Sequence, residues 1–277
     1  MNNDINIIIF SRNRAMQLDL LLRSLKKSFK EIKTTRVSVI YDFSDIEYFD
    51  AYEILKEDHP EVHFVTDTDG GTFKTTLLNL IDTKKQLTMF LCDDNIFVNQ
   101  WSINDIPIQE VNFSNEIIAC SLRLWDGIDT CYATRQLSPR PKYINDYTFY
   151  WNGANGDWGY PMSVDGNVYK TEFILGQIQF VNFSNPNTLE AGLASLSNTY
   201  AHKPMISFFK DKPKVINVPA NVVQTIYANR HFNSMTTMDL NQYFLNDKRI
   251  SLTPIYGKGF NTVHVELEFD IRGKNDT

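Results

Sequence analysis

Strand and helix patterns alternate along the first third of this chain, and this alternation restricts the fold more than any other feature of the sequence. Apolar runs typical of buried strands are each followed by a segment with helical spacing, the first of which has Leu18, Leu21, Leu22, Leu25 and Phe29 on one face. We expect strands at Ile5–Phe10, Arg36–Tyr41, Val62–Val65 and Leu87–Leu91, and further helices at Asp45–Glu57 and Thr72–Ile81. Crossovers of this length predict an α/β fold in which helices flank a mostly parallel sheet.

The second half of the chain has a different character. Residues 126–166 are rich in Trp, Tyr, Gly, Asn and Pro and keep no sustained period, which predicts a loop-rich region. The remaining elements that we expect are strands at Ile117–Leu124, Lys214–Val218 and Val263–Phe269 and helices at Lys170–Gln179, Asn187–Leu196 and Asp239–Leu245. A chain of 277 residues is within reach of one large domain. We therefore expect a single domain, 1–277, with halves 1–110 and 111–277 and its softest boundary near Pro107–Glu116.

Composition and charge exclude several classes of protein. With 43% hydrophobic and 22% charged residues the chain is globular rather than disordered. Its net charge of -6, without any run of Lys or Arg, disfavours a nucleic-acid binder. We expect no transmembrane segment and at most peripheral membrane contact, because no stretch approaches the roughly 18 apolar residues of a span. Cys92, Cys120 and Cys131 form no disulfide or zinc pattern, which fits a cytoplasmic protein.

The strongest local motif is the apolar strand that ends in Asp93, Asp94 and Asn95. Adjacent carboxylates repel each other unless a positive charge lies nearby, and a hard divalent cation supplies one. Oxygen ligands of this kind favour Mg²⁺ or Mn²⁺, which often bridge to substrate phosphates. The alternative is a solvated turn, because Asp and Asn also favour turns.

Other polar residues follow the remaining strands, at the edge where open α/β sheets bind ligands. Ser11–Arg14 precedes a helix start, where backbone N–H groups and two guanidinium groups suit an anion, although a simple polar turn has the same composition. Asp42 follows the second strand and suits a ribose or a base. Asp69–Thr72 leads to Lys74, but the spacing is not that of a Walker loop.

Together, Ser11–Arg14, Asp42 and the Asp93–Asn95 motif resemble the nucleotide-sugar-dependent glycosyltransferases of the GT-A fold, over residues 6–99. The resemblance implies a GT-A-like, Rossmann-like domain with a nucleotide-sugar-binding first half and an acceptor-side second half. It also implies that a "DxD" acid holds Mn²⁺ or Mg²⁺ against the donor diphosphate. Because Asn95 stands where a strict Asp-x-Asp has its second acid, the metal ligand is Asp94 with Asp93 beside it, or a neighbour by one position.

The resemblance also implies roles for other residues. Ser11, Arg12, Arg14, Asp42, Lys74 and Asp93 are the expected donor-binding residues, and Asp94, Asn95 and a late histidine, His231 or His202, the expected metal ligands. The aromatic and Gly-rich segment Trp151–Gly166 is similar to the acceptor-side loop of these enzymes, and its alternative is an ordinary packed loop with Trp151 and Trp158 as core anchors. Glu190 is the expected general base, ahead of Asp157 and Asp165, with a first-turn helix-dipole role as its alternative.

The function expected from this resemblance is a metal-dependent glycosyltransferase (a hexosyltransferase-like enzyme, EC 2.4). Its partners are a nucleotide-sugar donor, most simply a UDP-sugar, and a carbohydrate acceptor that is a glycan or a lipid-linked or protein-linked sugar. The alternatives are a catalytically inactive carbohydrate-binding or nucleotide-sugar-binding protein of the same fold and a nucleotidyltransferase. The last is disfavoured because no Gly-rich, Lys-containing loop follows the first strand.

Overall fold

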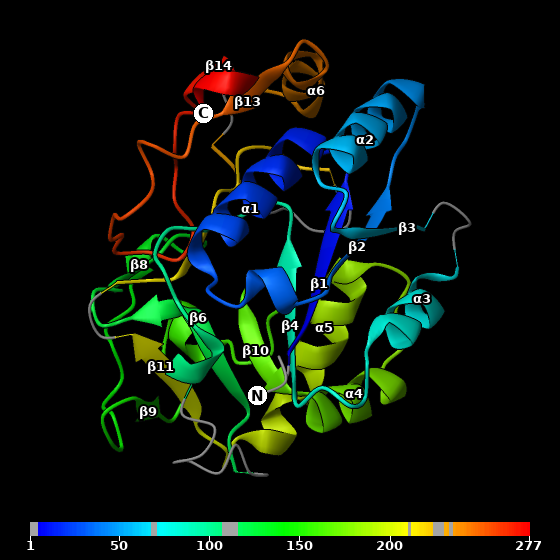
Figure 1. Ribbon diagram of the computed structural model, residues 1–277. Helices are drawn as coiled ribbons and strands as arrows, with labels where there is room; N and C mark the ends of the chain where they lie inside the picture. Colours follow the sequence, from blue (N-terminus) through cyan, green and yellow to red (C-terminus); the bar gives the residue numbers. More distant parts are fainter. Residues whose placement is uncertain (1–4, 68–70, 107–115, 210–211, 224–229, 233–234) are drawn as a thin grey trace.

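An eight-stranded sheet organises the molecule, with helices on both of its faces (Figure 1). The computed structural model describes residues 5–67, 71–106, 116–209, 212–223, 230–232 and 235–277. In spatial order the strands are β3 (His63–Thr66), β2 (Val37–Asp42), β1 (Ile5–Arg12), β4 (Leu87–Cys92), β10 (Asn167–Lys170), β6 (Ala119–Trp125), β11 (Met205–Phe209) and β9 (Thr148–Phe149). All but β10 and β9 run in one direction. The expected α/β fold with a mostly parallel sheet is confirmed.

Side chains of β1 alternate between two cores, as the period of a strand requires. Ile5, Ile7 and Ile9 pack in one core with α1 (Ala15–Ser28), α2 (Ile46–Asp58) and α6 (Thr237–Leu245). Ile8 and Phe10 pack in the other core with α3 (Phe73–Leu80), α4 (Thr171–Phe180) and α5 (Pro186–Leu196). The strand is therefore apolar throughout because both faces of the sheet are covered.

Three small sheets complete the fold. β5 (Asn95–Phe97) pairs with β12 (Val215–Asn217), β7 (Thr130–Cys131) with β8 (Gln136–Leu137), and β13 (Lys248–Ile250) with β14 (Ile271–Gly273). The β5–β12 pair continues directly from the end of β4, so it brings residues near 217 to the edge of the main sheet.

Most expected elements are present within a few residues of their expected bounds, with two kinds of difference. The strand expected at Val263–Phe269 is wrong, because its pairing among the described residues is limited to the isolated bridge of His264 to Asn217 at the end of β12, while its alternating apolar side chains pack on the cores. Strands β10 and β11 were not expected, and they make the second half part of the same sheet. The expected boundary between halves 1–110 and 111–277 lies outside the described residues.

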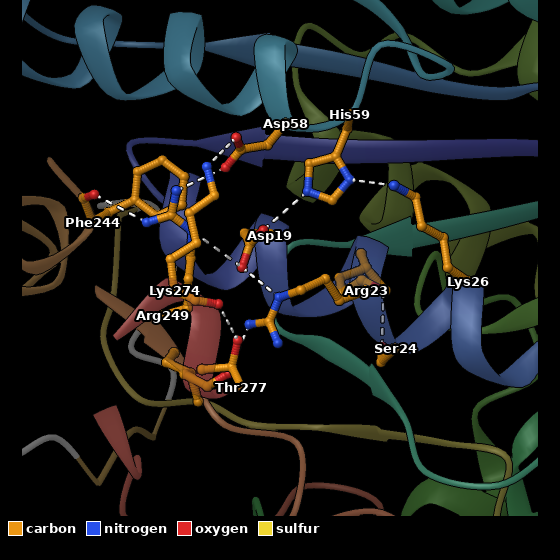
Figure 2. A network of polar contacts seen from close by, with 12 residues as sticks. Asp19, Arg23, Ser24, Lys26, Asp58, His59, Phe244, Arg249, Lys274 and Thr277 are labelled. Carbon is orange, nitrogen blue, oxygen red and sulfur yellow. Dashed lines mark hydrogen bonds and ion pairs between the residues drawn. The ribbon is translucent and has the colours of Figure 1, made fainter. Parts of the chain in front are cut away.

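A network of charged side chains, which we call the Asp19 network, joins α1 and α2 to β13 and to Lys274, which follows β14 (Figure 2). Asp19 on α1 lies 2.7 Å from Nε of Arg23 and 3.0 Å from Nε2 of His59. Arg249 of β13 lies 3.8 Å from Asp19 and 2.8 Å from Asp58, which also binds Lys274. Burial raises the pKa of Asp19, but the hydrogen bond with His59 and the charge of Arg23 outweigh it and lower that pKa.

Candidate active site

Four segments meet at the carboxyl edge of the main sheet and bring together most of the polar side chains of the candidate site. β1 and β4 end there side by side, and β10 begins there because it runs in the opposite direction between β4 and β6. The β5–β12 pair lies beside the end of β4. Residues from positions 11–14, 92–95, 163–167 and 217–221 are thus assembled by the topology alone.

Asp93 is held by a complete set of hydrogen-bond donors. Its Oδ1 accepts from Nη1 of Arg14 at 2.9 Å, and its Oδ2 accepts from the Ser11 hydroxyl at 3.0 Å and the Arg12 backbone N–H at 3.1 Å. Ser11 in turn shares a 2.6 Å hydrogen bond with the Tyr52 hydroxyl. The Asp93 carboxylate therefore links the ends of β1 and β4, and both of its oxygens accept hydrogen bonds in doing so.

Arg14 is fixed from its other side by the segment that follows β12. Its Nε donates to Oδ1 of Asn221 at 2.9 Å, and its Nη2 donates to the Asn221 carbonyl. Although burial alone would lower it, the neighbouring charges of Asp93 and Asp94 raise the pKa of Arg14. The guanidinium group is thus a fixed positive charge beside Asp93 and Asp94.

Asp94 differs from Asp93 in having few partners. Its nearest cation is Nη1 of Arg14, 4.0 Å from Oδ2, and its Oδ1 accepts from Asn217 at 3.4 Å, a long hydrogen bond. Burial, followed by repulsion from Asp165, raises the pKa of Asp94 to about 7. This carboxylate has the capacity to take a further cation.

Asp165 precedes β10, and it is the acid that repels both Asp94 and Glu190. Its charge raises the pKa of both Asp94 and Glu190, and its nearest cation is Arg123, with Nη1 3.8 Å from Oδ2. The Oδ1 atom of Asp165 is buried without a hydrogen-bond partner among the described residues. We call Asp94, Asp165 and Glu190 the edge cluster.

Glu190 reaches this cluster from α5, which begins at the Asn185 cap. Its Oε1 accepts from the Val164 backbone N–H at 3.1 Å, and burial, followed by repulsion from Asp165, raises its pKa to about 7. The first turn of α5 contains no acidic residue, so the helix-dipole alternative for Glu190 is wrong. Its carboxylate instead faces the segment that leads into β10.

Three site residues were not expected from the sequence. Nη1 of Arg123 on β6 donates to Oδ1 of Asn217 at 3.1 Å, so Asn217 links Arg123 to Asp94. Nδ1 of His264 lies 3.7 Å from Oδ1 of Asp157. A buried arginine within the apolar run Ile117–Leu124 was a usable signal for Arg123, whereas Asn217 and His264 are brought to the site only by tertiary pairing.

The remaining residues from the sequence-based site lie in various positions. Arg12 and Asp42 are paired at 3.1 Å on the neighbouring strands β1 and β2, as the expected strand order requires. Nζ of Lys74 donates to the Gln179 and Val181 carbonyls at 3.1 and 2.6 Å. Asn95 is buried, and its Oδ1 accepts from the Cys92 N–H at 2.9 Å.

Both candidate late histidines, His231 and His202, are exposed side chains. His231 precedes Phe232, whose backbone N–H donates to the Pro219 carbonyl at 3.2 Å. Their role as ligands stays a prediction. Over the described ranges, no three His, Cys, Asp or Glu side chains are grouped so as to hold a metal by themselves.

Comparison with known proteins gives one relative by sequence. The chain is 24% identical over 282 residues to the bifunctional glycosyltransferase pgtA of Dictyostelium discoideum, an alignment that covers 90% of this chain and 36% of pgtA. The chain thus spans about a third of the length of that curated relative. The similarity agrees with the resemblance to glycosyltransferases stated above. No family model matches the chain.

Solved structures with a partial likeness include two proteins bound to nucleotides or nucleotide sugars. Staphylococcus aureus TarS 1–349 in complex with UDP has a TM-score of 0.49 and 15% identity, covering 76% of this chain and 59% of that one. The mannosyltransferase PcManGT from Pyrobaculum calidifontis, in complex with GDP-Man and Mn²⁺, has a TM-score of 0.40 and 13% identity, covering 75% of this chain and 55% of that one. Separately, no helix in the described part of the chain has the length and apolarity to cross a membrane.

Proposed function

We propose that the chain is a glycosyltransferase that moves a hexose from a nucleotide-diphosphate donor to a hydroxyl group of a carbohydrate acceptor. The observation that carries the proposal is the edge cluster, in which three carboxylates share too little positive charge at the sheet edge where α/β folds bind ligands. Sequence similarity to a bifunctional glycosyltransferase supports the same class of reaction.

The donor nucleotide in this proposal, a UDP-sugar, binds along the ends of β1 and β2. Arg12 is half exposed and paired with Asp42, so both side chains are available to a ligand at this edge. Ser11, Arg14 and Asp93 fix the positions of the strand ends that form this surface, because Ser11 and Arg14 both donate hydrogen bonds to Asp93. Lys74 stays a predicted donor contact that must first leave the carbonyls at the end of α4.

A divalent cation, Mg²⁺ or Mn²⁺, fits the pair Asp94 and Asp165. Both supply carboxylate oxygens, Asp165 has a buried oxygen without a hydrogen-bond partner among the described residues, and the charge of Asp165 raises the pKa of Asp94. Mg²⁺ is commonly bound by one or two carboxylates together with waters and substrate phosphates, so a third protein ligand is not required. When bound, the cation neutralises charge on the diphosphate leaving group. We prefer this pair to Asn95 and His231 as ligands.

Glu190 is the proposed general base in a direct displacement that inverts the anomeric centre. The acceptor oxygen forms a bond to the anomeric carbon, the bond from that carbon to the diphosphate oxygen breaks with its electron pair on the diphosphate, and the hydroxyl proton passes to Glu190. A pKa of about 7 suits a base at neutral pH, because about half of the molecules carry the ionised group and that group is basic enough to take a proton. Asp157 and Asp165 are the alternatives for this role.

The proposal is tested by measuring the release of nucleoside diphosphate from a panel of nucleotide sugars, with and without Mn²⁺. We expect metal-dependent release in the wild type, loss of it in Asp94→Asn, and no change in Asp50→Asn, a matched substitution of an exposed acid on α2. A protein that only binds sugars would release no diphosphate with any donor. A nucleotidyltransferase would require a nucleoside triphosphate and release pyrophosphate, and either result rejects the proposal.

A further inference from the structure

A second group of buried and partly buried polar side chains lies next to Asp165. Arg123 on β6 is 5% exposed, and its Nη1 lies 3.8 Å from Oδ2 of Asp165. Asp157, in the 3₁₀ turn Gly156–Gly159, lies 3.7 Å from His264. The charges of Arg123, Asp157 and Asp165 all act on the pKa of His264, so the four side chains form one electrostatic group.

This group contains polar atoms that the described protein atoms leave unsatisfied. Nε of Arg123, Oδ2 of Asp157 and Oδ1 of Asp165 are all buried without a hydrogen-bond partner among the described residues. Buried polar atoms without partners are uncommon and costly, so their concentration points to a polar ligand or to ordered water. With the Asp165 oxygen assigned to the cation, one N–H donor on Arg123 and one carboxylate acceptor on Asp157 remain available.

His264 is held in a defined place and charge state. The Asn217 backbone donates to the Val263 carbonyl at 3.0 Å and accepts from the Val265 N–H at 2.8 Å, which fixes the residues on either side of His264. The imidazole stacks on the Tyr132 ring with centroids 6.1 Å apart, and the Arg230 guanidinium lies 4.1 Å from the same ring. Burial lowers the pKa of His264, so the neutral ring offers one donor and one acceptor.

We propose that Arg123, Asp157 and His264 bind two neighbouring hydroxyl groups of a neutral carbohydrate acceptor beside the edge cluster. This inference rests on the proposed function and specifies its acceptor. Vicinal hydroxyls each donate and accept, so a carboxylate, a neutral imidazole and a guanidinium N–H satisfy such a pair. Among the described residues this region has three acids, Asp157, Asp165 and Glu190, against Arg123, because Arg230 is paired with Glu266 at 2.9 Å. This excess of negative charge disfavours an acceptor sugar that carries a carboxylate or a phosphate.

Saturation-transfer NMR tests the inference on the full chain with UDP and Mg²⁺ present. The probes are methyl α-D-mannopyranoside, methyl β-D-galactopyranoside and methyl β-D-glucopyranoside, with methyl β-D-glucuronide as the anionic comparison. We expect a neutral glycoside to bind the wild type and its affinity to fall about tenfold in Asp157→Asn and in His264→Phe. His264→Phe retains a ring to stack on Tyr132, and Asp129→Asn, an exposed acid of the same region, should bind as the wild type does.

Three results would overturn the inference: no neutral glycoside binds, both variants bind it as tightly as the wild type, or the glucuronide binds equally well. The increase in melting temperature caused by UDP with Mg²⁺ is measured in every protein. Its retention in both variants shows that the donor half is intact, so a loss of glycoside binding is then specific. If the wild type has no such increase with any nucleotide diphosphate, it is the proposed function that fails.

Discussion

Two groups of buried or partly buried carboxylates in this molecule are partnered in opposite ways. In the Asp19 network, Asp19 lies within 3.0 Å of both Arg23 and His59, and Asp58 lies 2.8 Å from Arg249, so the pKa of both acids is lowered (Figure 2). In the edge cluster the nearest cations to Asp94 and Asp165 are 4.0 and 3.8 Å away, and the pKa of Asp94 and of Glu190 is raised to about 7.

The difference separates acids that stabilise the fold from acids that are available for chemistry. A fully partnered carboxylate is a fixed charge, and removing it leaves its partners buried and unpaired. A carboxylate that lacks partners destabilises the ligand-free protein. A bound ligand that supplies positive charge or hydrogen-bond donors removes that destabilisation. Four predictions test this division, starting with the largest effect.

The substitution Glu190→Gln should lower the rate of sugar transfer by about two to four orders of magnitude, because a neutral amide cannot take the acceptor proton. Turnover is measured at saturating donor and acceptor, with donor affinity as the control that should stay unchanged. Near-normal turnover, or a product with retained anomeric configuration, would move the role of base away from Glu190 and reopen Asp157 and Asp165.

The substitution Asp19→Ala should destabilise the protein by about 3 to 5 kcal/mol, because it leaves the buried Arg249 and its neighbours without their common partner. Urea unfolding measures this loss. At a temperature where the variant is folded, its affinity for the donor nucleotide should equal that of the wild type. A selective loss of nucleotide binding in a fully stable variant would contradict the structural role of the network.

Asp93 and Asp94 should respond differently to the same change although they are adjacent. Asp93→Asn weakens the hydrogen bonds with Ser11 and Arg14 and should cost about 2 kcal/mol of stability. Asp94→Asn should leave the stability of the metal-free protein unchanged or higher, since it removes a charge that has few partners. Equal losses in the two variants would show that Asp94 is also a structural acid.

The smallest expected effect is on the pH dependence of stability. The pKa of Glu190 is raised from 4.5 to about 7 in the folded protein, so folding takes up protons and Glu190 lowers stability as pH rises through this window. Glu190→Gln should therefore gain on the order of 1 kcal/mol relative to the wild type for each pH unit between pH 5 and 7. Urea unfolding at both pH values checks this, with the exposed Glu172→Gln as a control whose difference from the wild type stays flat.

The sequence predicted the first four strands and the helices between them because each carries its own periodic signal. It did not predict β10, which is four residues long and follows a Gly-rich segment, yet this strand brings Asp165 to Asp94. The alternation at Val263–Phe269 correctly indicated a half-buried segment but gave no sign that its pairing with β12 is limited to one bridge at His264. Asn217 and His264 were missed because neither lies in a local motif, and only long-range pairing places them at the site.

The reversed direction of β10 has a consequence for how such a protein can diversify. Gly166 donates its backbone N–H to Phe90 at 2.9 Å and accepts from Leu122 at 3.0 Å, so the start of β10 is bonded to a strand on each side. Its φ of 67° is a conformation that favours glycine, and an added Cβ would lie 3.3 Å from Arg123. Residues 126–162 form an excursion that leaves β6 and returns near this anchor. The exposed turns of that excursion, which also contributes β9 to the main sheet, can therefore change in length while Asp165 keeps its place at the start of β10.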